Sequence, residues 1–211
     1  MRTSLAITLL TGLIFVTACS DPAADKTKAV TTEPAKATSP ATAAQGQKYL
    51  ISPQASKIEF TGSKVTGSHN GSFNDFTGEI AYGGTPEKSS VNIKIKTETM
   101  TTDDEGLTKH LKTADFFDVG KFPEASFVST EIKPGGDKGA SHTVTGNLTL
   151  HGVTKAVTFP ATINVTPETA TVDSTFSINR RDFGINYAGQ ANNLIRDDVV
   201  LKLTIRANKA S

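Results

Sequence analysis

The chain has 211 residues, with 22 basic and 21 acidic side chains, a single cysteine and no tryptophan. This nearly balanced charge gives no support for nucleic-acid binding or for a basic membrane-binding patch. A single cysteine excludes an internal disulfide, so an exported domain in this chain must be held together by its core alone.

Residues 1–18 have the features of an export signal. Arg2 supplies an early positive charge, and residues 5–16 (LAITLLTGLIFV) are mostly apolar. This apolar run is too short to span a bilayer, which needs about 20 residues. A charged start, a short apolar core and a small-residue ending indicate a signal peptide over residues 1–18.

The sequence VTAC at residues 16–19 resembles the lipobox of bacterial lipoproteins. In that motif the cysteine becomes the lipidated first residue of the mature chain. The resemblance implies that acylated Cys19 attaches the protein to a membrane of the cell envelope, on its periplasmic side. Ser20, rather than an aspartate, favours the outer membrane over the inner one. The alternative is an ordinary signal peptide with an incidental cysteine.

Residues 20–48 contain no Leu, Ile, Phe or Tyr and are rich in Ala, Thr, Pro and Lys. Such a segment cannot bury enough apolar surface to offset the entropy of ordering it. We therefore predict that residues 19–48 comprise the lipidated cysteine and a flexible linker. The linker would span on the order of 30 Å, and residues 49–211 would form one domain.

Apolar and polar residues alternate along most of this domain, which predicts strands with one buried face and one wet face. That pattern is typical of antiparallel sheets. Short, turn-rich connections then indicate an all-β barrel or sandwich of about eight strands, and the pattern does not distinguish the two. The apolar positions of these strands are Phe76, Ile80, Tyr82, Val91, Ile93, Ile95, Val144, Leu148, Leu150, Val157, Phe159, Ala161, Ile163, Val172, Phe176, Ile178, Val199, Leu201, Leu203 and Ile205.

One short helix interrupts the strands. Thr102 and Glu105 have the spacing of a capping box, and Leu107, Leu111 and Ala114 recur at helical intervals. This pattern predicts a helix beginning at residue 102 and covering residues 102–112, which can close an open end of a barrel.

Five stretches resemble, in order, the signature sequences of the YceI-like family, and together they cover essentially all of residues 49–211. The resemblance implies an antiparallel, lipocalin-like barrel of about eight strands whose interior holds a long isoprenoid chain. It also implies export to the bacterial periplasm, and it places no catalytic residue on this chain. The stretches are YLISPQASKIEFTG, GSFNDFTGEI, HLKTADFFDVGKFPEASF, TGNLTLHGVTKAVTF and INRRDFGI.

The third stretch, residues 110–127, carries four phenylalanines on a connection broken by glycine and proline. We predict that the short helix and the loop through Phe116, Phe117 and Phe122 line the mouth of the barrel. The alternative is that these rings plug the barrel end as ordinary core. The residues that we predict to contact the ligand are Phe76, Ile80, Ile93, Ile95, Leu107, Leu111, Phe116, Phe117, Phe127, Leu148, Leu150, Phe159, Phe176, Ile178, Phe183 and Arg180.

Arg180 is the only charged side chain in that set. Its planar guanidinium suits the phosphate of a diphosphate head group or the oxygen of a quinone. The alternative is a structural corner in which Arg180 bonds backbone carbonyls and Asp182 pairs with it locally.

The remaining polar residues predict no metal, cofactor or catalytic site. The four histidines (His69, His110, His142 and His151) have no ligand spacing, and no HExxH, CxxC or GxSxG motif occurs.

The leading hypothesis is a membrane-anchored periplasmic carrier or buffer for an isoprenoid, of quinone or polyprenyl type. One alternative is a structural or stress-related envelope protein whose barrel is filled by its own side chains. Another is an enzyme that uses a polar cluster at the mouth, among His110, Asp115, Asp118 and Arg180.

Overall fold

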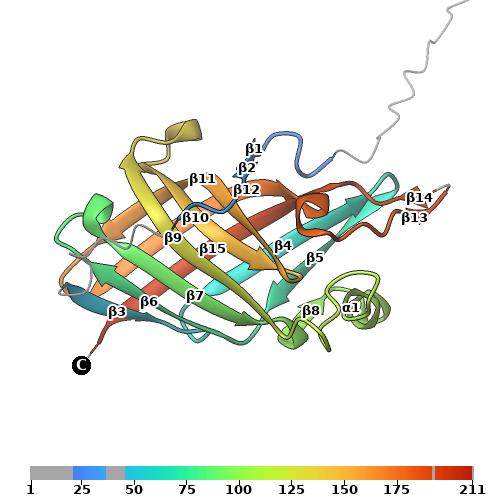
Figure 1. The fold of residues 1–211 in the computed structure, drawn as a ribbon, viewed down its shortest axis with the longest axis horizontal. Coiled ribbons are helices and arrows are strands. Elements are labelled where there is room, and N and C mark those ends of the chain that lie inside the picture. Colours follow the sequence, from blue (N-terminus) through green and yellow to red (C-terminus); the bar gives the residue numbers. More distant parts are fainter. Residues whose placement is uncertain (1–20, 37–45, 192, 211) are drawn as a thin grey trace, which may run out of the picture.

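The structure is a computed structural model that describes residues 21–36, 46–191 and 193–210, so Cys19 and the signal peptide lie outside the described residues. The described chain is mostly strand, with one α-helix, α1 (Glu105–Leu111), and several short 3-10 turns (Figure 1). The strands are β1 (Thr27–Lys28), β2 (Val30–Thr32), β3 (Gln47–Ile51), β4 (Lys57–Lys64), β5 (Gly67–Phe73), β6 (Phe76–Tyr82), β7 (Ser90–Lys96), β8 (Met100–Thr102), β9 (Glu124–Pro134), β10 (His142–Leu150), β11 (Val153–Val165), β12 (Thr169–Asn179), β13 (Gly189–Gln190), β14 (Asn193–Leu194) and β15 (Asp198–Lys209).

The strands close into an antiparallel barrel of eight. Its ring runs β12, β11, β10, β9, β7, β6, β3 and β15, and β15 pairs with β12 to complete it. At one end of the barrel, β4, β5 and β8 extend the wall from β15. Because β4 follows β3 and β6 follows β5 along the chain, each of these two pairs of strands forms one long, bent segment of the barrel wall. The predicted lipocalin-like barrel is confirmed, and the sandwich is excluded.

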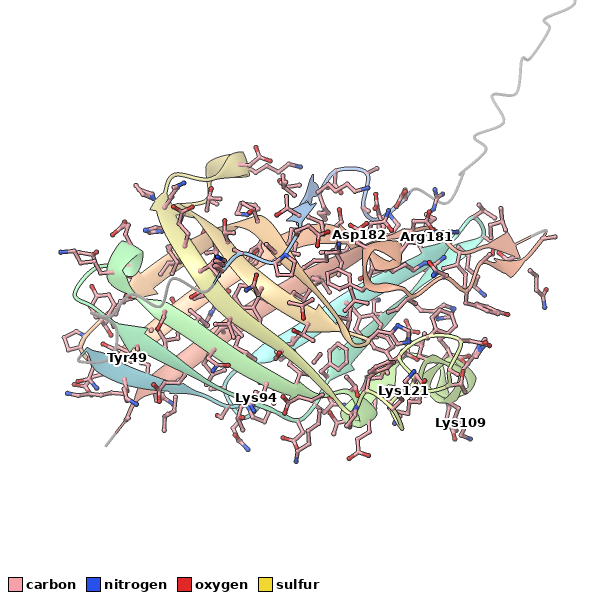
Figure 2. All side chains as sticks on the ribbon, viewed as in Figure 1. Tyr49, Lys94, Lys109, Lys121, Arg181 and Asp182 are labelled. Atoms are coloured by element: carbon pink, nitrogen blue, oxygen red, sulfur yellow. The ribbon has the colours of Figure 1, made fainter. Side chains whose placement is uncertain are left out.

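The alternation in the sequence sets which side chains fill the barrel. In β7, Ile93 and Ile95 are buried, while Lys94 and Lys96 between and beside them are exposed. Successive side chains of a strand point to opposite faces of the sheet, so closing the ring gathers one apolar face inside. Figure 2 shows Lys94 on the outer surface of the wall.

The helix is shorter than predicted and begins later. Its N-cap is Asp104, whose side chain accepts a hydrogen bond of 2.6 Å from the backbone N–H of Leu107. Thr102 is the last residue of β8, and its backbone N–H donates to Thr108 Oγ1 at 2.9 Å. The predicted start at Thr102 is wrong because the aspartate, itself a favoured N-cap residue, takes that role. The helix does lie beside one end of the barrel (Figure 1).

The segment over residues 21–36, which we call the strap, lies on the barrel wall. Strands β11 and β12 pair directly only between residues 162–165 and 170–173. Farther along they separate, and β1 pairs in parallel with β12 while β2 pairs antiparallel with β11. The predicted flexible linker is therefore wrong for residues 21–36. Composition misled the prediction because strand pairing, and not apolar burial alone, holds this segment.

Two tyrosines pack against each other at the end of the barrel away from α1. Tyr49 is only 2 % exposed, and its hydroxyl donates to the backbone oxygen of Thr166 at 2.7 Å. Its ring meets that of Tyr82 edge to face, with the centroids 6.3 Å apart. Burial raises the pKa of the Tyr49 phenol. In Figure 2, Tyr49 lies at the opposite end of the molecule from Lys109 of α1.

Candidate functional site

The barrel encloses a cavity of about 480 Å³ with a predominantly aliphatic and aromatic lining. This volume lies within the range of about 300–1,000 Å³ typical of small-molecule sites. The described residues therefore do not fill the barrel, which contradicts the alternative of an interior packed solid by its own side chains.

Most of the predicted ligand-contacting residues border this cavity. The exceptions are Phe76 and Phe183, which are 1 % and 0 % exposed and do not line it. Phe76 packs in the core cluster that includes Met100, and Phe183 follows β12 in a 3-10 turn, where the strand alternation no longer applies. The predicted residues that do line the cavity are Ile80, Ile93, Ile95, Leu107, Leu111, Phe116, Phe117, Phe127, Leu148, Leu150, Phe159, Phe176, Ile178 and Arg180.

Several lining residues were missed. Ile58 and Phe60 line the cavity from β4. They alternate with polar residues in the sequence KIEF, so this alternation could have predicted them as lining residues. Phe73 is in contact with Phe60, the ring centroids lying 5.6 Å apart. Tyr187 comes from an irregular segment after β12, and only the folded chain brings it to the site.

Two glycines explain why large rings leave the interior hollow. Phe60 pairs with Gly71 across β4 and β5, and a Cβ on Gly71 would lie 2.2 Å from Cζ of that ring. A Cβ on Gly146 of β10 would likewise lie 2.3 Å from Cζ of Phe127. Each ring therefore occupies the space above a glycine on the wall. Because the rings lie against the wall there, they line the cavity without filling its centre.

The aromatic loop after α1 forms one side of the cavity. Phe116 is 6 % exposed, and its ring centroid lies 5.1 Å from that of His110 and 5.2 Å from that of Tyr187. Phe117 is half-buried and meets Phe73 edge to face at 5.8 Å. Both rings border the cavity. They are thus at once packed core and cavity wall, so the two interpretations of this loop are compatible.

Phe122, in contrast, does not line the cavity, and its predicted place at the mouth is wrong. Its ring packs on His151, with the centroids 4.7 Å apart, at the hairpin between β10 and β11. At Gly152 of that hairpin, φ is +74° and a Cβ would lie 2.4 Å from Cε1 of Phe122. Phe122 therefore covers a turn outside the cavity.

Arg180 is a structural corner that also borders the cavity. It is 4 % exposed, and its Nε and Nη1 donate to the backbone oxygens of Arg196 and Ile185 at 3.1 and 2.8 Å. Its acidic partner is Asp197, 3.3 Å from Nη2, and not Asp182 as predicted. Asp197 lies next to Arg180 because the backbone N–H of Arg180 also donates to the Asp197 carbonyl. Burial lowers the pKa of the guanidinium.

The polar residues on the lining carry basic or neutral groups. Within the described part of the chain, the titratable lining residues are Lys64, His69, His110, Tyr187, Arg180 and Arg196, with no Asp or Glu among them. Each of the two histidines is paired with a carboxylate. His69 lies 2.8 Å from Asp103, and His110 lies 2.8 Å from Asp115. The backbone N–H of Asn70, and then His69, lower the pKa of Asp103.

The four polar side chains of the enzyme hypothesis do not form one cluster of contacts. The structure pairs His110 with Asp115, but Arg180 is held by carbonyls and Asp197. Among residues 21–36, 46–191 and 193–210, no group of three His, Cys, Asp or Glu side chains could hold a metal ion. The helices in the same residues include none with the length and apolar character to cross a bilayer.

An antiparallel barrel closed around an apolar cavity defines the lipocalin-like class. More specifically, the sequence model of the YceI-like domain family matches residues 49–207, and the chain belongs to this family. A UPF0312 protein of Pseudomonas putida (strain F1) is 40 % identical over 137 residues, covering 62 % of this chain and 70 % of the relative. One from Pseudomonas syringae pv. tomato is 37 % identical over 140 residues, covering 63 % and 72 %.

Solved structures share the fold at lower identity. Burkholderia cenocepacia BcnA superposes with a TM-score of 0.65 at 24 % identity, covering 74 % of this chain and 99 % of that protein. A structure from Saccharophagus degradans, described as a polyisoprenoid binding domain, gives 0.62 at 16 % identity, covering 79 % and 100 %. The Campylobacter jejuni YceI protein gives 0.58 at 22 % identity, covering 67 % and 85 %.

The corner formed by Arg180 yields a stability prediction. Replacing Arg180 with Met leaves the buried carbonyls of Ile185 and Arg196 without donors, so the free energy of unfolding should fall by about 2–4 kcal/mol. Arg181→Met is the matched control, because Arg181 is exposed and, among the described residues, its side chain bonds Asp197 alone, at 2.6 Å. That variant should lose less than about 1 kcal/mol. Urea denaturation measures both, and equal losses would contradict the corner role.

Proposed function

We propose that the protein binds the isoprenoid chain of a lipid inside the barrel and acts as its carrier or buffer. The single observation that carries this proposal is the apolar cavity of about 480 Å³, bordered by aliphatic and aromatic side chains from β4, β5, β6, β7, β9, β10, β11, β12 and β15. The description of the Saccharophagus degradans structure as a polyisoprenoid binding domain supports the same class of ligand. The lipid is of quinone or polyprenyl type.

The hydrophobic effect suffices for such a ligand. Burying one five-carbon isoprene unit contributes about 4 kcal/mol, at about 0.8 kcal/mol for each carbon. Two or three units reach about 8–12 kcal/mol, which corresponds to micromolar to nanomolar affinity before association costs are subtracted. A cavity that works in this way selects length and flexibility, and it needs no catalytic group.

The proposed setting is the cell envelope. The lipobox around Cys19 supports attachment of the mature chain to a membrane on the periplasmic side, and Ser20 favours the outer membrane. An isoprenoid chain partitions between bilayer and barrel because both surround it with apolar groups. Attachment to the membrane shortens the path between the two.

A cavity-filling substitution tests the site. Ile93 faces the cavity from β7, so Ile93→Trp should occupy part of the hollow and weaken binding of a fluorescent polyprenol at least tenfold. Lys94→Trp places the same ring on the outer face of the same strand and should leave affinity unchanged. Equal affinity of both variants for the polyprenol, with both folded by circular dichroism, would contradict binding in the cavity.

The aromatic loop gives a second test. Phe117→Ser removes a half-buried ring that borders the cavity, so affinity for the polyprenol should fall about three- to tenfold while the barrel stays folded. Phe122→Ser is the control, because this ring covers the β10–β11 hairpin and is not on the lining. It should lower the melting temperature without changing affinity. A wild-type affinity in Phe117→Ser would exclude the loop from tail binding.

A further inference from the structure

Two hairpins form an apolar tip at the rim of the cavity. Val65 follows β4, Leu194 ends β14, and each is 50 % exposed. The backbone N–H of Val65 donates to the Leu194 oxygen at 3.3 Å, so the two side chains belong to adjoining segments. Lys64 and Asn193, their chain neighbours, line the cavity. In Figure 1, the β4–β5 and β13–β14 hairpins project beyond the barrel at the end where α1 lies.

A single exposed aliphatic residue on a protein surface is ordinary. Val65 and Leu194 differ because they adjoin each other on two projecting hairpins and flank an apolar cavity. Lys64 precedes Val65, and a lysine stem can lie along apolar surface while its ammonium stays in water. This combination suits the boundary between lipid headgroups and acyl chains.

The strap begins at the same rim. Asp21 Oδ2 lies 3.3 Å from Nη1 of Arg196, which lines the cavity. Arg196 in turn donates its backbone N–H to the oxygen of Ser63, in β4, at 2.9 Å. Ala23, two residues after Asp21, is 8 % exposed. The first described residues of the chain are therefore held at Arg196, two residues after Leu194 of the tip.

Further contacts keep the strap from acting as a free linker. The backbone N–H of Ala29 donates to the Ser177 oxygen at 2.8 Å, and Ala29 packs in the core cluster that contains Phe159 and Phe176. The side chain of Asn147 bonds both the backbone oxygen and the N–H of Ala35, at 2.8 and 3.0 Å. Together with the β1 and β2 pairings, these contacts hold the strap against β10, β11 and β12.

Chain length then limits where an anchor can be. Cys19 precedes Asp21 by two residues, and each residue spans at most about 3.8 Å, so the two Cα atoms lie within about 8 Å. An acyl group on Cys19 therefore leaves the protein beside the cavity rim. A linker on the order of 30 Å, as composition suggested, would leave the orientation of the barrel free.

We propose that the Val65–Leu194 tip is a membrane-contact surface, and that the strap turns the cavity mouth toward the bilayer that holds Cys19. The proposal rests on the proposed acylation of Cys19. In this orientation an isoprenoid chain passes between bilayer and cavity at the rim, with little exposure to water. The partner is a lipid surface, because the covalent anchor and the apolar tip lie at the same end of the barrel.

Tryptophan fluorescence tests the contact, since the natural chain has no tryptophan. Val65→Trp and Leu194→Trp place a single reporter on the tip, and Leu50→Trp places one on β3, where Leu50 is 51 % exposed. The full acylated protein is inserted in phosphatidylethanolamine–phosphatidylglycerol vesicles with brominated acyl chains. We expect the two tip reporters to shift to the blue and to lose at least half their emission. Leu50→Trp should behave as it does in water.

The outcomes distinguish the membrane contact of the Val65–Leu194 tip from the acyl anchor on Cys19. Acylated, vesicle-bound protein whose three reporters are equally unquenched would overturn the membrane contact and leave the anchor intact. A concentration-dependent blue shift of the tip reporters without vesicles would overturn it in favour of self-association. Mature protein whose Cys19 carries no acyl chain by mass spectrometry would overturn the anchor, and this proposal with it.

The strap has its own test. Ala29→Asp places a carboxylate in the cluster around Phe159 and Phe176 and should release the strap, and Asn147→Ala removes the clamp on Ala35 more mildly. In the Leu194→Trp background, either change should reduce quenching at least twofold while the protein still sediments with vesicles. Protease cleavage within the strap shows whether Ala29→Asp has released it. If the strap is released and quenching is unchanged in both variants, the strap does not orient the barrel.

Discussion

The structure depends on one packing constraint, which is that an eight-stranded ring must enclose its inward side chains without being filled by them. Barrels of this size have interiors that side chains can fill completely or that can hold one small ligand. Here the rings of Phe60 and Phe127 lie over Gly71 and Gly146, where any Cβ would collide with them. These two inward rings thus lie along the wall, and a cavity of about 480 Å³ remains.

The same constraint separates the two ends of the barrel. At one end Tyr49 is buried and its hydroxyl donates to the Thr166 oxygen. At the other end α1, the aromatic loop and two hairpins surround the cavity, and the polar residues of the lining gather there. Arg180 contributes by bonding carbonyls on both sides of this region, which makes it a support for the rim. The two ends of the barrel therefore differ, with a buried tyrosine at one and polar lining residues at the other.

Period-two alternation was enough to predict the strands, the inward residues such as Ile93 and Phe176, and hence most of the cavity lining. It did not predict Phe76 as core, because alternation tells which face a strand residue is on and not whether another side chain covers it. Phe183 lies in a 3-10 turn after β12, where alternation does not apply. Tyr187 and the Asp197 partner of Arg180 depend on contacts between distant segments. The strap was missed for a related reason, since its β1 and β2 strands exist only where β11 and β12 separate. The N-cap is Asp104 and not Thr102, because both side chains can cap a helix and the capping-box spacing alone did not choose between them.

The proposed function requires the cavity to be a dry space that holds an isoprenoid tail. The most direct measurement is native mass spectrometry of the protein ejected from bacterial envelope vesicles without detergent. We expect a bound species that dissociates on activation and fragments by successive losses of five-carbon units. A bare protein mass in every preparation, from cells grown under varied conditions, would contradict it.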